Sequence, residues 1–179
     1  DRKRRCEADV TTAGGAPVAA LRVLTFTTLY PNAAKPNHGV FVENRLRQTL
    51  ARHDMSATVL APVPFFPFTS DVFGSYARYA RAPLKEVRHG IDVHHPRYLL
   101  IPKIGMSIAA TLLYRGALAA CRRLGFDNET IDVIDAHYFY PDGVAAAYLA
   151  RALNVPFVVT ARGSDLNLLP QHPSVRRAI

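Results

Sequence analysis

The sequence has too few cysteines for a covalent framework. Cys6 and Cys121 are the only two among 179 residues, and they lie far apart in the chain. Two cysteines at this separation form neither a disulfide scaffold nor a metal-ligand motif, and such usage is typical of a reducing, cytoplasmic compartment. Long apolar runs are also missing, since no window approaches the ~18 to 20 unbroken apolar residues of a membrane span. The composition therefore predicts a soluble, globular chain.

Several phosphate-binding and hydrolytic motifs are missing as well. No Gly-x-Gly-x-x-Gly follows the first apolar run, so a nicotinamide or flavin dinucleotide site is not expected. The sequence also lacks the Gly-x-x-x-x-Gly-Lys-Ser/Thr loop of nucleoside triphosphatases and the Gly-x-Ser-x-Gly elbow of α/β-hydrolases. Three common classes of α/β enzyme are therefore not expected.

The chain divides into a lead-in and one domain. Residues 1–20 begin with basic residues, but Glu7, Asp9, Gly14 and Pro17 leave no apolar stretch long enough for a secretory signal. We expect residues 1–20 to be disordered and residues 21–179 to form a single domain, a length sufficient for a substantial core.

From residue 21 onward, short β-favouring runs alternate with amphipathic helical patterns. The expected strands cover residues 21–27, 58–61, 131–135 and 156–160, and the expected helices cover residues 40–53, 106–124 and 144–153. A hairpin is expected at residues 84–95, with His89-Gly90 as its turn. This alternation predicts an α/β, Rossmann-like, doubly wound fold: a mostly parallel sheet with helices on both faces.

Three loops are expected at the carboxyl ends of these strands, where ligands bind in open parallel sheets. The first ends in His38-Gly39, where a glycine allows close backbone approach and helix N-terminal amides favour an anion. The second begins at His137, which could donate to a sugar hydroxyl or neutralise developing negative charge. For both loops a plain structural role, such as a histidine satisfied by Asp135, stays open.

The third loop, Thr160 to Asp165, follows the last expected strand. Arg162 places a cation suited to a phosphate or carboxylate at the strand end. Gly163 permits a tight turn, and Ser164 or Asp165 can cap the next helix.

The net charge of +8 raises the question of anionic partners. The clearest excess of positive charge lies in residues 78–103, next to a cluster of aromatic residues. The stretch could attract phosphates, anionic lipid headgroups or nucleic acid, or form an ordinary solvated surface. The aromatics could graze a membrane or pack into the domain. Because they are confined to one proline-broken loop, nucleic acid is not the expected partner. The basic residues are Arg78, Arg81, Lys85, Arg88, Arg97 and Lys103; the aromatic residues are Phe65, Phe66, Phe68, Phe73, Tyr76 and Tyr79.

Three segments, in this order, resemble the N-terminal domain of family 4 glycosyltransferases of the GT-B fold. They are Leu24–Pro31 with His38–Val42, Asp132–His137, and Val158–Asp165. The similar enzymes act in the assembly of bacterial teichuronic acid, exopolysaccharide and lipopolysaccharide. The resemblance extends from about Leu21 to the end of the chain.

This resemblance implies one half of a GT-B fold, namely the acceptor-binding domain of a retaining glycosyltransferase. The enzyme would transfer a sugar from a nucleotide-sugar to a glycan or lipid-linked acceptor, without a cofactor or essential metal. It would work in the cytoplasm, at the inner face of the plasma membrane. The C-terminal donor domain is absent from this sequence, so the chain alone is expected to be inactive. The alternative is a non-catalytic Rossmann-like module that binds a glycan or an anionic lipid.

The resemblance also assigns roles to residues. His137 would be the catalytic residue, in contact with the donor sugar or its leaving phosphate, and Gly39, next to His38, would lie beside the donor diphosphate or sugar. The floor of the donor cleft would be formed by Arg162, Gly163, Ser164 and Asp165. Many family members carry histidine where this chain has Arg162.

Overall fold

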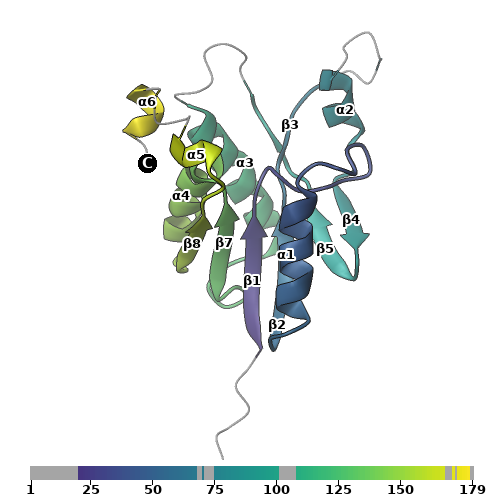
Figure 1. Ribbon diagram of the computed structural model, residues 1–179, viewed down its shortest axis with the longest axis vertical. Helices are drawn as coiled ribbons and strands as arrows, with labels where there is room; N and C mark the ends of the chain where they lie inside the picture. The colour runs from purple at the N-terminus through teal and green to yellow at the C-terminus, as the bar shows by residue number, and fades with distance from the viewer. Residues whose placement is uncertain are drawn as a thin grey trace, which may run out of the picture.

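A six-stranded sheet organises the chain in the computed structural model (Figure 1). The structure describes residues 20–67, 70, 75–100, 108–167, 171 and 173–177. The strand order is β4-β5-β2-β1-β7-β8, and every neighbouring pair is parallel except the β4–β5 hairpin. The strands are β1 (Leu21–Phe26), β2 (Met55–Leu60), β4 (Lys85–Arg88), β5 (Ile91–His94), β7 (Val133–His137) and β8 (Phe157–Thr160). The prediction of a mostly parallel α/β sheet is confirmed.

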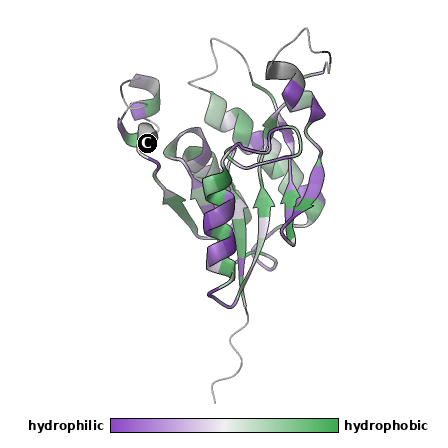
Figure 2. Cartoon of the chain, turned by 45° about the vertical axis from the view of Figure 1, so that its right-hand side comes forward, coloured by the Kyte–Doolittle hydropathy of each residue, from purple (hydrophilic) through white to green (hydrophobic). Residues whose placement is uncertain are grey.

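Helices cover both faces of the sheet. Helix α1 (Val40–Leu50) lies on one face, in front of β2 and beside β1 in Figure 1, and α3 (Ala109–Leu124) and α4 (Val144–Leu153) lie on the other. Colouring by hydropathy shows polar and apolar residues alternating along α1 (Figure 2). Each of the three helices buries part of its surface against the sheet, as amphipathic helices do.

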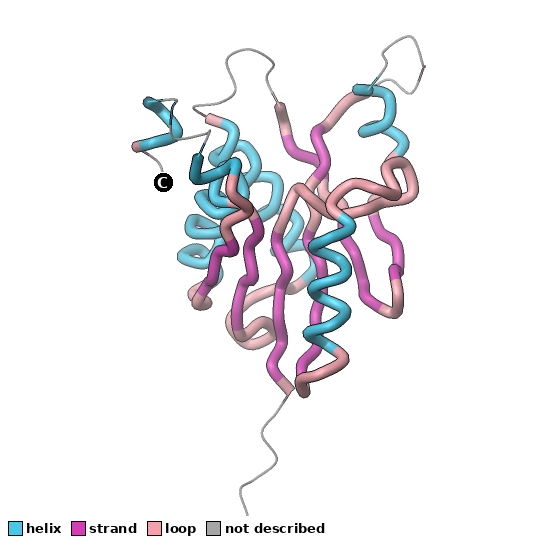
Figure 3. The backbone as a smooth tube through the Cα atoms, viewed as in Figure 1, coloured by secondary structure: helices cyan, strands magenta, loops and turns pink. Residues whose placement is uncertain are grey.

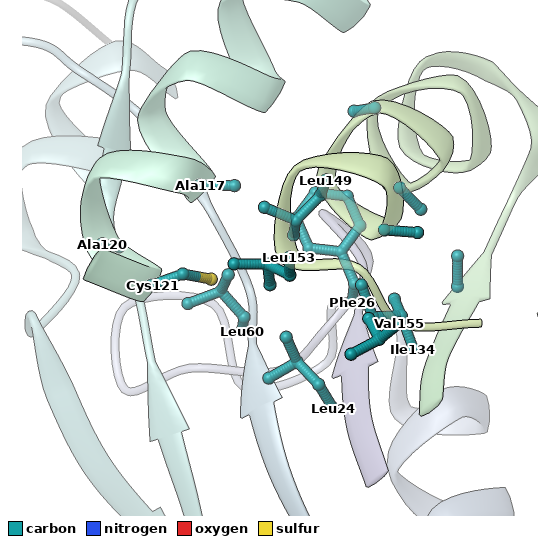
Figure 4. Close-up of a cluster of buried hydrophobic side chains, with 14 of the residues drawn as sticks. Leu24, Phe26, Leu60, Ala117, Ala120, Cys121, Ile134, Leu149, Leu153 and Val155 are labelled. Carbon is teal, nitrogen blue, oxygen red and sulfur yellow. The ribbon is translucent and has the colours of Figure 1, made fainter. Parts of the chain in front are cut away.

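The larger core fills the space between the sheet and the α3–α4 pair (Figure 4). Leu24 and Phe26 of β1 are fully buried there, against Leu149 of α4 and Leu113 of α3. Small residues on both helices let them approach the strands closely. Each buried leucine or phenylalanine contributes roughly 1.5–3 kcal/mol relative to an exposed side chain, so this face anchors the sheet.

The second core lies beneath α1. Val42 and Leu46 pack on Val59 of β2. Phe41, which follows the same apolar pattern in the sequence, is instead 48% exposed. Glu43 is buried on this helix, and its carboxylate accepts a 2.6 Å hydrogen bond from Arg88 of β4. A buried carboxylate is tolerated because it is paired.

Several boundaries differ from the predicted ones, most clearly those of β2 and β7. The second strand begins at Met55 rather than Thr58, and β7 continues to His137, two residues beyond its predicted end. The hairpin is confirmed: His89 and Gly90 have φ of 51° and 80°, the positive values that a tight two-residue turn between twisted strands needs.

The remaining elements lie near the carboxyl edge of the sheet. The segment after β2 contains a short strand: β3 (Val63–Pro64) pairs in parallel with β6 (Arg97–Tyr98). The other elements are α2 (Ser75–Arg81), an irregular turn η2 (Phe139–Gly143) with a cis Tyr140–Pro141 bond, α5 (Ser164–Asn167) and α6 (Pro173–Arg176).

Some expectations fall outside the described residues. These are the disordered lead-in at residues 1–19, the start of the 106–124 helix, Cys6, Lys103, Phe68, Phe73 and the side chain of Tyr76. Within the described ranges, no helix is long and apolar enough to cross a membrane.

Candidate functional site

The three predicted loops converge at one edge of the sheet. Strands β1, β7 and β8 are adjacent and parallel, so their carboxyl ends lie side by side (Figures 1 and 3). Helix α1 begins at this edge, directly after His38-Gly39. The structure therefore brings the first turn of α1, the end of β7 and the β8–α5 loop into one region, which we call the cleft edge.

His137 is the last residue of β7, and its side chain is almost fully buried. Its Nδ1 lies 2.8 Å from Nη2 of Arg162 and 3.4 Å from Nη1 of Arg45, while its Nε2 lies 3.3 Å from the Asp135 carboxylate. A guanidinium can only donate, so we assign Nδ1 as the acceptor and place the proton on Nε2, facing Asp135. Asp135 thus binds His137, as one interpretation of the sequence expected, and the catalytic role of His137 stays a prediction.

Arg162 spans the cleft edge between two side chains. Its guanidinium contacts His137 on one side and lies 4.8 Å from the ring centre of Phe41 on the other. Burial, and next the charge of Arg45, lower the pKa of Arg162, which remains a cation at neutral pH because arginine starts so high. Its Nε is buried and has no hydrogen-bond partner among the described residues. Phe41 is exposed because it supports this arginine rather than the core.

Arg45 is a site residue that the sequence did not reveal. It lies on the exposed side of α1, where a basic residue is ordinarily expected only to contact solvent. Its Nη1 nevertheless donates a 2.7 Å hydrogen bond to Thr160 Oγ1 of β8. Two guanidinium groups therefore flank one edge of His137. Such a pair can bind a phosphate or carboxylate by charge-assisted hydrogen bonds.

Asp165 connects two of the loops. It is fully buried, and its carboxylate accepts hydrogen bonds from the backbone N–H of Arg162 at 2.8 Å and of Phe139 at 2.7 Å. Both oxygens thus hold the loops after β7 and β8 together. Gly163 has a φ of 91° in the same turn, and Ser164 begins α5. In this structure Asp165 positions the backbone around Arg162.

Gly39 and His38 end the loop after β1. Gly39 has a φ of 73°, and a Cβ built on it would lie 2.2 Å from the carbonyl oxygen of Leu29. The glycine is therefore required by the path of its own chain. His38 donates from Nε2 to the Thr28 carbonyl at 3.2 Å. Burial, and next the charge of Lys35, lower the pKa of His38, so this ring is neutral at pH 7.

Asp142 is the second residue that sequence reasoning missed. It is fully buried in η2, and its carboxylate accepts bonds from Thr27 Oγ1 at 3.0 Å, from the Thr28 N–H at 2.7 Å and from Thr28 Oγ1 at 3.0 Å. Burial raises the pKa of Asp142 to about 7, although these hydrogen bonds act in the opposite direction. The residue ties the loop after β7 to the loop after β1. Its only signal in the sequence is an acidic residue just before a helix.

The basic stretch does not form one continuous patch of free charge. Lys85 pairs with Asp92 at 3.0 Å, Arg88 pairs with Glu43, and Arg97 donates to the backbone carbonyl groups of His95 and Ala82. In the described part of the chain, no group of three histidine, cysteine, aspartate or glutamate side chains is arranged to hold a metal ion.

A Rossmann-like sheet with two arginines and a histidine at its carboxyl edge has the chemistry suited to a polar, anionic ligand. Comparison with known protein families identifies the family to which the chain belongs. The model of glycosyltransferase family 4 matches residues 44–179, and the chain therefore belongs to this family.

A relative from Bacillus subtilis (strain 168) is 32% identical over 153 residues, which is 85% of this chain. Its name describes a glycosyltransferase of teichuronic acid biosynthesis, TuaC. The chain spans 39% of the length of that relative.

Proposed function

We propose that this chain is the acceptor-binding half of a retaining glycosyltransferase that builds a bacterial cell-surface polysaccharide. The donor would be a nucleotide-sugar, and the acceptor a glycan or a lipid-linked sugar, with no cofactor or essential metal. Membership of glycosyltransferase family 4 supports the reaction class, and the name of the Bacillus relative supports the pathway class. We further propose a cytoplasmic location at the inner membrane surface, where a lipid-linked acceptor is accessible.

The observation that carries the proposal is the meeting of Arg45, Arg162 and His137 at the cleft edge. Transfer from a nucleotide-sugar leaves a diphosphate whose negative charge grows as the bond to the sugar breaks, and fixed cations stabilise such charge. Arg162 is held by a backbone that Asp165 fixes, so its guanidinium needs little rearrangement to act. His137, held between Asp135 and Arg162, would contact the sugar or its leaving phosphate.

The proposal is tested with His137→Ala in the full-length protein. We expect turnover to fall about 100-fold, because one positioned polar group at a charge-developing centre contributes about that much. Sugar transfer would be measured from a radiolabelled nucleotide-sugar, with folding checked by circular dichroism. His53→Ala, an exposed histidine just after α1, is the matched control and should keep full turnover. Unchanged turnover in a folded His137→Ala protein would contradict the role assigned to His137.

A further inference from the structure

A cavity with basic side chains in its lining lies beside the cleft edge, at the carboxyl ends of β1 and β2. Its volume is about 220 Å³, and its walls come from the loop after β1, the segment around β3, and α2. It adjoins the cleft edge through Thr28 and His38, since Thr28 lines the cavity and its carbonyl accepts the hydrogen bond from His38. Nothing in the proposed transfer step uses this cavity.

The lining of the cavity has one sign of charge. Lys35 and Arg78 line it together with His38, and among the described residues neither aspartate nor glutamate does. The ammonium of Lys35 lies 3.7 Å from the centre of the Tyr79 ring, so an aromatic face, and not a carboxylate, supports it. Arg78 projects from α2 and is exposed, with no ion pair to another described residue. Two cations therefore face one small cavity, and neither forms an ion pair with a carboxylate of the residues that the structure describes.

Two carboxylates on neighbouring elements are already engaged and do not line the cavity. Glu86 lies 2.8 Å from His95 Nε2; His95 is a fully buried lining residue whose Nδ1 lies 3.0 Å from the Ala61 carbonyl oxygen. Asp142 is held by Thr27 and Thr28. No carboxylate among the described lining residues neutralises the cations, so an incoming anion would supply that counter-charge.

The size of the cavity restricts the ligand. Sites for drug-sized molecules occupy roughly 300–1,000 Å³, which is larger than this cavity. A phosphate or diphosphate group fits the smaller volume, and it matches a lysine point charge beside an arginine fork. Apolar residues, among them Leu29, Val63 and Ala82, form the rest of the wall.

We propose that this cavity binds the phosphate or diphosphate group of the acceptor. The assignment to the acceptor rests on the proposed function, because the cavity lies on the β2 side of β1 whereas the cleft edge lies on the β7 and β8 side. An acceptor held by its phosphate in the cavity would extend across His38 towards His137. The chain would thereby select acceptors that carry a phosphate next to the sugar or lipid.

The test uses equilibrium binding of inorganic pyrophosphate to this chain, measured by titration calorimetry at low ionic strength. We expect saturable binding that weakens at least about tenfold in Lys35→Gln and in Arg78→Gln, the loss of one charge-assisted contact each. Added salt should weaken binding further. Arg115→Gln removes the same charge from the exposed surface of α3, outside the cavity, and should leave the affinity unchanged.

Three results would overturn the proposal. The first is the absence of saturable pyrophosphate binding. The second is binding that Lys35→Gln and Arg78→Gln leave intact but Arg45→Gln removes, because the anion would then occupy the cleft edge. The third is binding to phosphatidylglycerol vesicles, and not to phosphatidylcholine vesicles or pyrophosphate, because the cations would then serve a membrane surface. Equilibrium binding needs no donor, so a failure of sugar transfer in the full-length protein remains a separate outcome.

Discussion

Replacement of Gly39 by alanine should lower the free energy of unfolding by more than ~4 kcal/mol, a loss found only where a named structural requirement is broken. Two costs add. The residue has a φ of 73°, a left-handed conformation that disfavours side chains, and its Cβ would lie 2.2 Å from Leu29 O and 2.4 Å from the carbonyl carbon. Both atoms belong to the backbone, so the loop after β1 or the start of α1 must move. Urea unfolding followed by circular dichroism measures the change.

Gly90→Ala is the matched control for this variant. Gly90 has a similar φ of 80°, but nothing lies within 4 Å of a Cβ built on it. Only the conformational cost remains there, roughly 1–2 kcal/mol. Equal losses in Gly39→Ala and Gly90→Ala would show that close contact with Leu29 is not the dominant constraint.

Asp142 should have the second-largest effect, and one with an unusual dependence on pH. Asp142→Ala leaves the Thr28 N–H and two hydroxyl groups without their acceptor. We expect it to cost about 3 kcal/mol, since each buried polar group left unsatisfied costs about 1–3 kcal/mol. Unfolding in urea at pH 5 measures this loss.

The pH dependence follows from the direction of the pKa shift. The pKa of Asp142 is raised in the folded chain to about 7, above its unfolded value near 4. The folded state therefore binds the proton more tightly. The stabilisation by the protonated carboxyl is fully present below the unfolded pKa and is lost as the pH rises through about 7.

Asp142→Asn removes this titration while keeping the shape of the side chain. Relative to the wild type, the stability of Asp142→Asn should rise between pH 5 and pH 8, by on the order of 2 kcal/mol. Asp132→Asn is the contrasting control. Hydrogen bonds from Arg22 lower the pKa of Asp132 to about 2, so its difference from the wild type should stay constant over the same interval. A constant difference for Asp142→Asn as well would contradict the raised pKa.

Much of the fold is readable from the sequence because it depends on local patterns. The β-favouring runs at the positions of β1, β7 and β8, separated by helical periodicity, predict the parallel sheet. His89-Gly90 predicts the hairpin, because both positions need a positive φ. The same reasoning places His38-Gly39, His137 and the Arg162 loop at strand ends. Their meeting at one edge follows from right-handed parallel crossovers.

Other features are set by contacts between residues far apart in the chain. Phe41 and Glu43 have the sequence positions of a core residue and a surface residue, yet Phe41 is exposed beside Arg162 and Glu43 is buried against Arg88. Periodicity defines a helical face, but the rotation of α1 on the sheet decides what that face meets. Arg45 joins the site for the same reason, since its partner Thr160 lies 115 positions away in the sequence.

The sequence by itself determined the fold class, the family and the three loops, because strand and helix patterns and short motifs are local properties of the chain. Only the tertiary structure decided the tautomer of His137, the linking roles of Asp142 and Asp165, and the cavity between Lys35 and Arg78. Each of these depends on distances between separate loops at one sheet edge. Burial and paired charges at this edge change the protonation and the hydrogen bonding of a side chain. Neither burial nor charge pairing can be predicted from a local sequence pattern.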